Sequence, residues 1–401
     1  MVNSIHSSDD ARRIARRRLP WMVFDYIDGS AGRETGAARN RAAFDALELR
    51  PRILRDVSDR SLSVPLFGQT AKVPFGISPM GMCNLSAPGA DMMLARLAAR
   101  ENVPLGVSTV ASTAMEPLIE TAQGNAWFQL YFSGDGAGTF KLVERAKAAG
   151  YQTIVLTVDV PEVGRRPREL RHGFTMPFRI GPKQFIDFAL HPRWSLNTLF
   201  KGKPDMANFA MPGYEFDRTE SRAKADWDTL SRLRDMWPGQ LVVKGVLDVQ
   251  DSLDLRAAGV DAIQVSSHGS RQLDSAPAPI TALSDIRAAL GDDYPLFYDT
   301  GPAQRRRRGK SVRSRREFHL LWPHPAICHR RRWRRRPEPA LGCVKIGNKH
   351  NACADRPEIP DLIQRFVGIL TPARRVILPS RVDIRPDKWR GCGQCLAAPH
   401  Q

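Results

Sequence analysis

The stretch that decides the fold is Ala262-Ile-Gln-Val-Ser-Ser-His268-Gly269-Ser-Arg271-Gln-Leu-Asp274. Its first five residues are mostly apolar or small, which is typical of a short buried strand. The strand ends at a histidine, which can take up a proton near neutral pH. Gly269 lets the backbone turn sharply, and Arg271 offers a planar fork for a carboxylate. A base and a carboxylate clamp at one strand end indicate chemistry on a small organic acid, although a turn with a hydrogen-bonded histidine and a solvated arginine would also fit these residues alone.

The length and composition are those of a globular protein. The 401 residues allow one large domain or two ordinary ones, and 42% hydrophobic residues are enough for a core. We expect no signal peptide, because residues 1–20 hold no apolar run, and no spanning helix, because no run of 18 apolar residues exists. Six cysteines are too few for a disulfide framework and predict a reducing compartment, the cytoplasm.

The net charge of +18 is concentrated in one segment. Residues 305–336 hold 13 Arg and 1 Lys against Glu317 alone, so they contribute +13 and the rest of the chain only +5. The basic character therefore describes this segment and not the fold.

Seven short apolar runs alternate with helical segments. The predicted strands are residues 73–80, 104–109, 126–131, 153–159, 240–245, 262–266 and 295–301. The predicted helices are residues 11–18, 90–100, 115–121, 139–149, 249–258 and 281–290. This alternation, with polar residues at the strand ends, predicts an α/β fold of the TIM (β/α)₈ barrel type with its active site at the carboxyl ends of the strands. An open doubly wound sheet is the alternative, but no glycine-rich dinucleotide motif follows the first strand.

An insertion, residues 173–214, follows the fourth predicted strand. It mixes aromatic and apolar residues with Arg and Lys. Such a segment suits the surface of a membrane, and it equally suits a lid over the barrel mouth.

The opening stretch resembles the signature Ser-Asn-His-Gly-x-Arg-Gln-Leu-Asp of the FMN-dependent α-hydroxy-acid-oxidising family, with Ser267 in place of Asn. That family includes glycolate oxidase, L-lactate dehydrogenase and mandelate dehydrogenase. The resemblance extends from Arg12 to about Gly301. It implies FMN as cofactor and oxidation of an L-2-hydroxy acid of the lactate or mandelate type to its 2-oxo acid.

The resemblance also implies roles for individual residues. His268 would be the base, Asp159 would orient and stabilise its imidazole, and Tyr131 would hydrogen-bond the substrate. Arg166, Arg271, Tyr26 and Tyr131 would hold the substrate. From the residues alone, Asp159 could be a helix cap, Arg166 a surface charge and each tyrosine a buried wall residue.

A lysine at the end of an apolar strand, Lys244, is costly unless it meets an anion, and the edge of a reduced flavin is one. The FMN-binding residues that the resemblance implies are Pro79, Met80, Gly81, Ser108, Gln129, Thr157, Lys244, Ser266, Asp299 and Gly301. Gly81 lies where members of that family carry Gly or Ala, and by this resemblance it favours a dehydrogenase over an oxygen-using oxidase. No metal site is expected.

The resemblance ends after Gly301. The family continues with a phosphate-binding segment and an eighth strand, neither of which can be found in the sequence. We therefore predict residues 1–301 as the barrel, 302–355 as an arginine-rich aberrant segment and 356–401 as a C-terminal tail. On this prediction the eighth β/α unit is disrupted, the barrel is open, and FMN binding or activity is impaired.

The arginine-rich segment has an alternative interpretation. A non-catalytic protein could use Arg305–Arg336 to bind the phosphates of nucleic acid or anionic lipid. We rank this second and do not expect a nucleic-acid partner. Cys392 and Cys395 resemble half a zinc knuckle, but no matching half precedes them.

The partners follow from the resemblance as well. The stretch His191-Pro-Arg-Trp-Ser-Leu is similar to the membrane-associated lactate and mandelate dehydrogenases. It implies a cytoplasmic protein attached peripherally to the inner face of the cell membrane, a quinone or cytochrome as electron acceptor, and a homotetramer.

Overall fold

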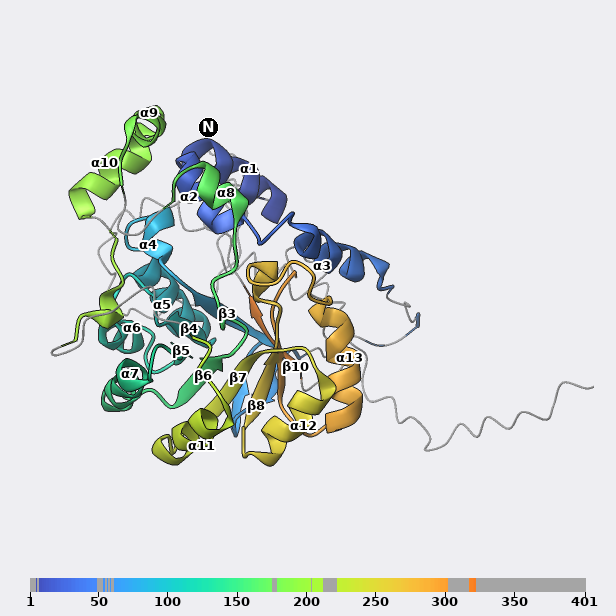
Figure 1. Cartoon of the computed structure of the whole chain (residues 1–401). Helices are drawn as coiled ribbons and strands as arrows, with labels where there is room; N and C mark the ends of the chain where they lie inside the picture. Colours follow the sequence, from blue (N-terminus) through green and yellow to red (C-terminus); the bar gives the residue numbers. More distant parts are fainter. Residues whose placement is uncertain are drawn as a thin grey trace, which may run out of the picture.

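The structure, a computed structural model, describes residues 5, 7–48, 53–54, 56, 58, 61–174, 179–202, 204–211 and 222–301 and the backbone of 317–321. Eight parallel strands close into a barrel in the order β10-β3-β4-β5-β6-β7-β8-β9 (Figure 1). The predicted TIM barrel is confirmed. The doubly wound alternative is wrong, because the sheet closes on itself.

All seven predicted strands and all six predicted helices are present, with shifts at their ends. The strands are β3 (Phe75–Met80), β4 (Leu105–Ser108), β5 (Ala126–Tyr131), β6 (Thr153–Thr157), β7 (Gln240–Val246), β8 (Ala262–Val265) and β9 (Leu296–Tyr298). Five of the predicted helices surround the strands as α5 (Ala90–Glu101), α6 (Met115–Thr121), α7 (Ala137–Ala148), α12 (Val249–Ala257) and α13 (Pro279–Leu290), and the sixth is α1, described below. Helix α11 (Trp227–Met236), for which no range was predicted, also packs around the barrel. Strand β9 is shorter than predicted because Thr300 and Gly301 adopt positive φ angles of 82° and 85°, which no strand allows.

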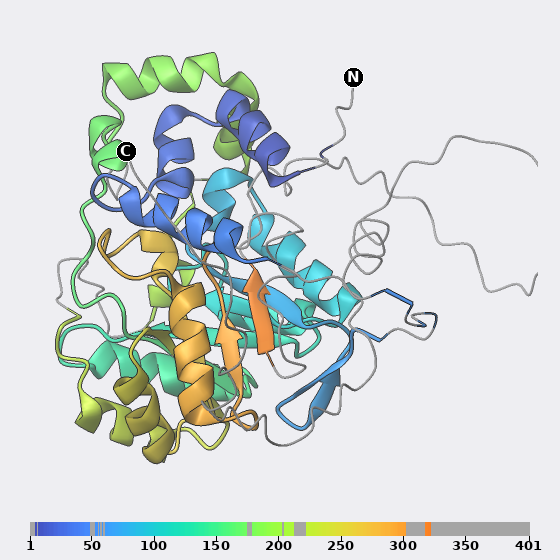
Figure 2. The ribbon, with the colours of Figure 1, turned by 90° about the vertical axis from the view of Figure 1, so that its right-hand side faces the viewer.

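The eighth strand is a correction. Strand β10 (Glu317–Leu321) pairs with β9 through Glu317 opposite Leu296, and with β3 through His319 opposite Phe75. Figure 2 shows β9 and β10 side by side. The predictions that residues 302–355 contain no strand and that the barrel is open are therefore wrong. The chain after β10, including the zinc-knuckle cysteines and the predicted tail from 356, lies outside the described residues.

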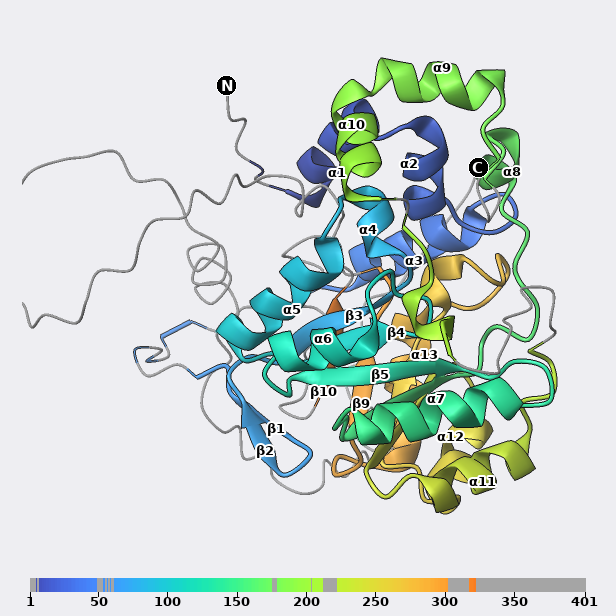
Figure 3. The same ribbon diagram turned by 90° about the vertical axis from the view of Figure 1, so that its left-hand side faces the viewer.

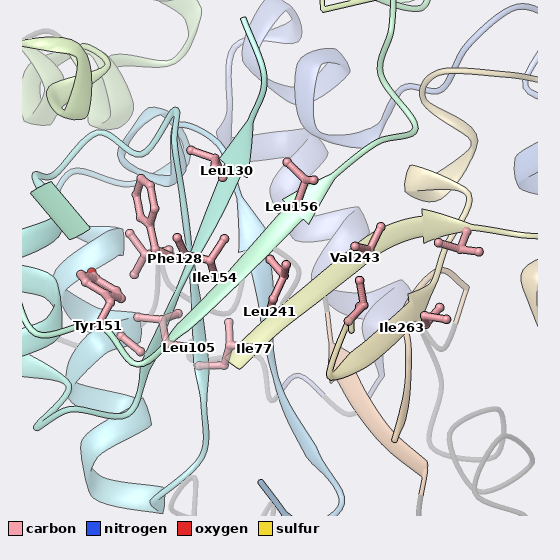
Figure 4. Close-up of a cluster of buried hydrophobic side chains, with 14 of the residues drawn as sticks. Ile77, Leu105, Phe128, Leu130, Tyr151, Ile154, Leu156, Leu241, Val243 and Ile263 are labelled. Carbon is pink, nitrogen blue, oxygen red and sulfur yellow. The ribbon is translucent and has the colours of Figure 1, made fainter. Parts of the chain in front are cut away.

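Alternate residues of each strand face the barrel interior or the helices. The outward-facing residues form the main core with the helices; Figure 4 labels Phe128, Ile154, Leu241 and Ile263 among them. Inside the barrel, a smaller apolar cluster includes Trp127 of β5 and Phe297 of β9 near the amino-terminal ends of the strands.

A hairpin of β1 (Val64–Leu66) and β2 (Gln69–Ala71) adds to this inner cluster. Its Phe67 packs 5.7 Å from the ring of Trp127 and 5.5 Å from that of Phe297. Figure 3 shows the hairpin beyond one end of the barrel. Apolar side chains thus fill the barrel interior at the amino-terminal ends of the strands. The buried polar groups of the interior lie at the carboxyl ends of the strands.

The chain before β1 forms helices α1 (Ser8–Arg18), α2 (Trp21–Asp28) and α3 (Thr35–Ala46). Helix α1 begins earlier than predicted because Ser7 and Asp10 form a reciprocal capping box. The insertion forms α8 (Pro167–Arg171), α9 (Pro182–Leu190), α10 (Pro192–Lys201) and a 3₁₀ turn, η1 (Ala207–Phe209). Short α4 (Cys83–Ser86) follows β3.

A second small core joins the N-terminal helices to the insertion. Trp194 of α10 is buried with Leu19 and Phe24 and donates a hydrogen bond from Nε1 to the Leu85 carbonyl at 2.8 Å. Figures 1 and 3 show α9 and α10 at the edge of the molecule beyond these helices. Within the part of the chain that the structure describes, no helix is both long and apolar enough to cross a bilayer.

Candidate active site

The histidine that ends the predicted strand lies beside the acid that follows β6. His268 Nδ1 is 2.9 Å from Asp159 Oδ1, and both side chains are largely buried. His268 Nε2 faces the hydroxyl of Tyr131, at 3.5 Å, and the two rings stack with centroids 6.4 Å apart. Because an ionised carboxylate can only accept a hydrogen bond, Nδ1 carries the proton, and Nε2 is left with a lone pair that faces the Tyr131 hydroxyl. The three residues therefore form a base with its orienting acid and a neighbouring hydroxyl.

Burial sets the protonation of this group. It lowers the pKa of His268 below its ordinary value, with Asp159 acting in the opposite direction. Burial alone would raise the pKa of Asp159, but the interaction with His268 and the charge of Lys244 outweigh it and lower this pKa, so the carboxyl stays ionised. Burial raises the pKa of Tyr131 to about 12, so its hydroxyl stays protonated at neutral pH. The arrangement supplies a neutral base and a protonated hydroxyl donor.

The base is held in a strained conformation. His268 has φ +54°, in the left-handed region that costs a side chain about 1–3 kcal/mol. A β-carbon on Gly245 would meet the Asp159 β-carbon at 2.5 Å, so only glycine lets β7 pass so close to the acid. Both features place the imidazole against its partner at the carboxyl end of the barrel.

The two predicted clamp arginines meet at one carboxylate. Arg166 Nη1 donates to both oxygens of Glu169, at 2.7 and 3.0 Å, and Arg271 Nη2 donates to Glu169 Oε1 at 3.2 Å. Arg166 Nε also donates to the Arg271 carbonyl at 3.2 Å. The Arg271 guanidinium lies 5.5 Å from the ring centre of Tyr26, whose pKa burial raises. The structure thus brings Arg166, Arg271 and Tyr26 together, with Glu169 as a fourth member.

A layer of buried polar side chains fills the carboxyl end of the barrel. Lys244 Nζ donates to Ser266 Oγ at 2.9 Å and lies 3.5 Å from Asp299 Oδ2. Ser78 and Gln264 donate to the same Asp299 oxygen, at 3.0 and 2.9 Å. Burial disfavours the charged lysine, but Asp299 and Asp159 raise the pKa of Lys244 above its ordinary value, so the ammonium persists.

The remaining predicted residues border this layer. Ser108 Oγ donates to Gln129 Oε1 at 2.9 Å, and Gln129 Nε2 donates to Thr157 Oγ1 at 3.0 Å, which forms a buried chain across β4, β5 and β6. Pro79 and Met80 end β3 and Gly81 follows it, where a β-carbon on Gly81 would meet Val110 at 2.5 Å. Gly301 lies against Phe44 at the end of the described chain before β10.

The residues that follow the arginine in the signature hold other segments in place. Gln272 Oε1 accepts from the Gly164 amide at 2.8 Å, in the segment that leads to Arg166. Asp274 accepts from the Thr35 hydroxyl at 2.9 Å and the Gly36 amide at 2.7 Å, at the start of α3. The signature therefore positions the clamp and the start of α3 as well as the base.

The departure at Ser267 is accommodated locally. Asn40 of α3 donates from Nδ2 to Ser267 Oγ at 3.2 Å and to Ser270 Oγ at 2.8 Å. A side-chain amide is thus still present beside His268, although it comes from a distant helix.

Sequence reasoning missed Glu169, Gln272, Asp274, Asn40 and Arg222. Glu169 follows Arg166 by three residues at the start of a helix, a spacing that favours ion pairs and could have identified it. Arg222 lies 5.1 Å from the ring centre of Tyr131, and no sequence pattern indicates this contact. Among the described residues, no group of histidine, cysteine or acidic side chains is arranged to hold a metal ion.

The sequence of this chain is similar to those of known flavin-dependent dehydrogenases. Residues 15–309 match the family model described as FMN-dependent dehydrogenase. The chain is 36% identical over 309 residues to (S)-mandelate dehydrogenase of Pseudomonas putida, covering 75% of this chain and 78% of that protein. It is 35% identical over 312 residues to L-lactate dehydrogenase of Pseudomonas syringae pv. syringae, covering 74% and 80%.

Solved structures of related proteins are also similar to this chain. The crystal structure of the monotopic membrane protein (S)-mandelate dehydrogenase matches with a TM-score of 0.74 and 33% identity, covering 81% of this chain and 88% of that one. The structure of mandelate oxidase with (S)-2-phenylpropionate matches with a TM-score of 0.67 and 30% identity, covering 81% and 86%.

Proposed function

Because the chain belongs to the FMN-dependent dehydrogenase family, we propose that it oxidises an L-2-hydroxy acid of the lactate or mandelate type to the 2-oxo acid. The observation that carries the proposal is the arrangement of His268, Asp159 and Tyr131 beside two arginines at one barrel end. Such an acid offers a hydroxyl for the base and a carboxylate for the arginines.

The residues present fit FMN. Lys244 is buried to 4% exposure, and within the described part of the chain its ammonium, a group with three donors, meets Ser266 and Asp299. Gln264 Oε1 is buried in the same layer with no hydrogen-bond partner among the described residues. We infer that these two, with Ser108, Gln129 and Thr157, would hold the polar edge of the ring. The segment Pro79–Gly81, with Ser266, Asp299 and Gly301, would complete the site.

In this proposal His268 performs the proton transfer. Its Nε2 takes the proton of the substrate hydroxyl, and the imidazolium that forms is stabilised by Asp159 at 2.9 Å. FMN, when bound, would supply the acceptor for the electron pair that leaves with the α-hydrogen. Tyr131 keeps its proton and donates a hydrogen bond to the substrate beside Nε2. Arg166 and Arg271 bind the carboxylate and so orient the α-carbon.

The first test is spectroscopic. We expect the purified chain to be yellow and to be bleached by L-lactate or (S)-mandelate in the absence of oxygen, because both electrons of the substrate then stay on the bound FMN. The acid that bleaches faster identifies the preferred side chain. A colourless protein, or a yellow one that no 2-hydroxy acid bleaches, would contradict the proposal and favour the prediction that residues 302–401 disable an inherited site.

A second proposal concerns the membrane. Apolar side chains of the insertion are exposed to solvent: Ile180 62%, Phe185 67%, Ile186 59%, Leu190 63%, Leu196 53%, Leu199 75% and Phe200 82%. Basic side chains lie among them at Arg179, Lys183, Arg193 and Lys201, all exposed. Apolar and basic side chains together suit the headgroup region of an anionic bilayer. We propose that α9 and α10 attach the protein peripherally to the inner face of the cell membrane. In this proposal the protein is a homotetramer, and a quinone or cytochrome accepts its electrons.

Replacing Leu199 and Phe200 with glutamate should weaken binding to anionic phospholipid vesicles by about tenfold or more, since each buried side chain contributes about 1.5–3 kcal/mol. The measurement is co-sedimentation with vesicles. The matched control is Trp227→Glu with Leu253→Glu, two exposed apolar residues on α11 and α12. Equal loss in both double variants would argue against the insertion as the attachment surface, and catalytic bleaching should be unchanged in either.

A further inference from the structure

The carboxylate that joins the two clamp arginines belongs to the protein itself. Arg166, Arg271 and Glu169 have side-chain exposures of 12%, 11% and 12%, so all three charges are largely removed from water. Burial and the neighbouring Arg166 both lower the pKa of Arg271, although a guanidinium remains charged at any working pH. Two positive charges and one negative charge leave this cluster with a net charge of +1.

The position of Glu169 is fixed by its helix. The neighbouring Arg168 donates to Asp25 at 2.8 Å and to Asp28 at 2.9 Å, which ties α8 to α2 (Figure 1). Glu169 therefore reaches the arginines from a helix that is anchored on its other side.

Donor groups remain for a second anion. Glu169 occupies Nη1 of Arg166 and one hydrogen of Arg271 Nη2, while Arg271 Nη1 donates to the Gly29 carbonyl at 2.6 Å. Arg166 Nη2 and Arg271 Nε make no hydrogen bond to the described residues. The cluster can thus accept one more carboxylate without displacing Glu169, and that carboxylate would bring its net charge to zero.

We propose that Glu169 is the built-in counter-ion of the clamp and selects substrates with one carboxylate over substrates with two. This inference rests on the proposed function, because it assumes that the clamp binds a 2-hydroxy acid. A first carboxylate balances the remaining charge. A second carboxylate on the same carbon would be buried without a counter-ion, which is costly in a site of low dielectric constant. Glu169 is thus a specificity-determining residue with no part in the proton transfer.

The test compares two ligands that cannot be oxidised because they lack an α-hydrogen. They are 2-hydroxy-2-methylpropanoate, with one carboxylate, and 2-hydroxy-2-methylpropanedioate, in which a carboxylate replaces one methyl group. Their dissociation constants for the FMN-loaded protein are measured by calorimetry. The ratio of the two constants is the readout, because changes in stability or FMN content affect both ligands alike.

We expect the wild-type protein to prefer the monocarboxylate. Glu169→Gln should shift the ratio toward the dicarboxylate by about tenfold or more, because the cluster then carries +2. Glu169→Asp keeps the charge and should leave the ratio within about threefold. The matched control is Glu116→Gln, which removes the carboxylate from another Arg–Glu pair, with Arg145, where the two bonds are 2.6 and 2.9 Å. Glu116→Gln should leave the ratio of the two dissociation constants unchanged.

A second pair of variants keeps the inference testable if two unbalanced arginines prevent Glu169→Gln from folding. Arg166→Gln has a cluster charge of zero, and Arg166→Gln with Glu169→Gln restores it to +1. The double variant should bind both ligands more tightly than Arg166→Gln does, with the wild-type preference for one carboxylate. If the ratio of the two dissociation constants does not change when Glu169 is replaced, in the wild-type protein or in Arg166→Gln, the inference is overturned and the proposed function is unaffected. Failure of the wild-type protein to bind either ligand overturns the inference and the proposed function together.

Discussion

His268→Asn is expected to lower the turnover of a 2-hydroxy acid by about 10²–10⁴-fold, the usual contribution of a positioned general base. The variant loses the lone pair that Nε2 presents beside Tyr131, while asparagine still tolerates the left-handed backbone at this position. The measurement is the rate of anaerobic bleaching at saturating substrate. FMN content should be unchanged, because His268 is not among the residues proposed to hold it. Loss of less than about tenfold would mean that another group takes the hydroxyl proton.

The pH dependence of the same rate shows in which direction the surroundings shift the pKa of His268. His268 acts only when neutral, so activity falls as the pH drops through its pKa. Burial lowers that pKa, so the wild-type protein should keep its activity below about pH 6.5, the value for an unperturbed histidine. In Asp159→Asn the carboxylate that raises the pKa is gone, so the acid limb should move to still lower pH while the maximal rate falls. An acid limb that moves upward would contradict the pairing of Asp159 with His268.

Lys244→Met should have an effect of similar size by a different route. Asp299 would lose the buried cation 3.5 Å away, and an uncompensated buried charge costs about 3–5 kcal/mol. The variant should unfold at a markedly lower temperature and release FMN, and bleaching should be at least about 10²-fold slower because a preorganised charge is lost. Thermal unfolding and the visible spectrum report the two effects separately.

The double variant Lys244→Met with Asp299→Asn separates stability from function. It removes both charges, so thermal stability should return most of the way to that of the wild-type protein. Bleaching should stay slow, because the positive charge toward FMN is still absent. Recovery of the rate together with stability would show that Lys244 serves the fold alone.

Much of the barrel follows from local patterns. Strands such as Ala126–Tyr131 match their prediction to the residue, because alternate side chains pack outward on helices and inward on the barrel interior. Strand β10 was missed since its closure depends on backbone pairing with β9 and β3, which arginine-rich flanks conceal. The short hairpin β1–β2 and helix α3 were missed because their stability comes from distant contacts, such as that of Phe67 with Trp127.

The residues of the site also divide into those that local sequence patterns identify and those that only the fold reveals. The base, its acid and the two arginines could be named because each stands at a strand end or in a motif that resembles a family. Asn40 could not, since its importance lies in its contact across the fold with the serine at position 267. For Glu169 the sequence offered only its spacing from Arg166, and its contact with Arg271 is visible only in the fold. A sequence shows which charges exist but not which of them share one buried cluster.

The bonds between Asp274 of the signature and the start of α3 have a consequence for synthesis in the cell. Thr35 and Gly36 emerge from the ribosome well before Asp274, which follows Thr35 by 239 residues. At about 5–20 residues per second, this interval lasts roughly 10–50 s. Throughout it, the start of α3 lacks its bonds to Asp274, whereas α1 and α2 can already pack on Leu85 and Trp194. We therefore expect a polypeptide that ends before residue 274 to be cleaved by proteases first at the start of α3, however well the preceding strands have formed.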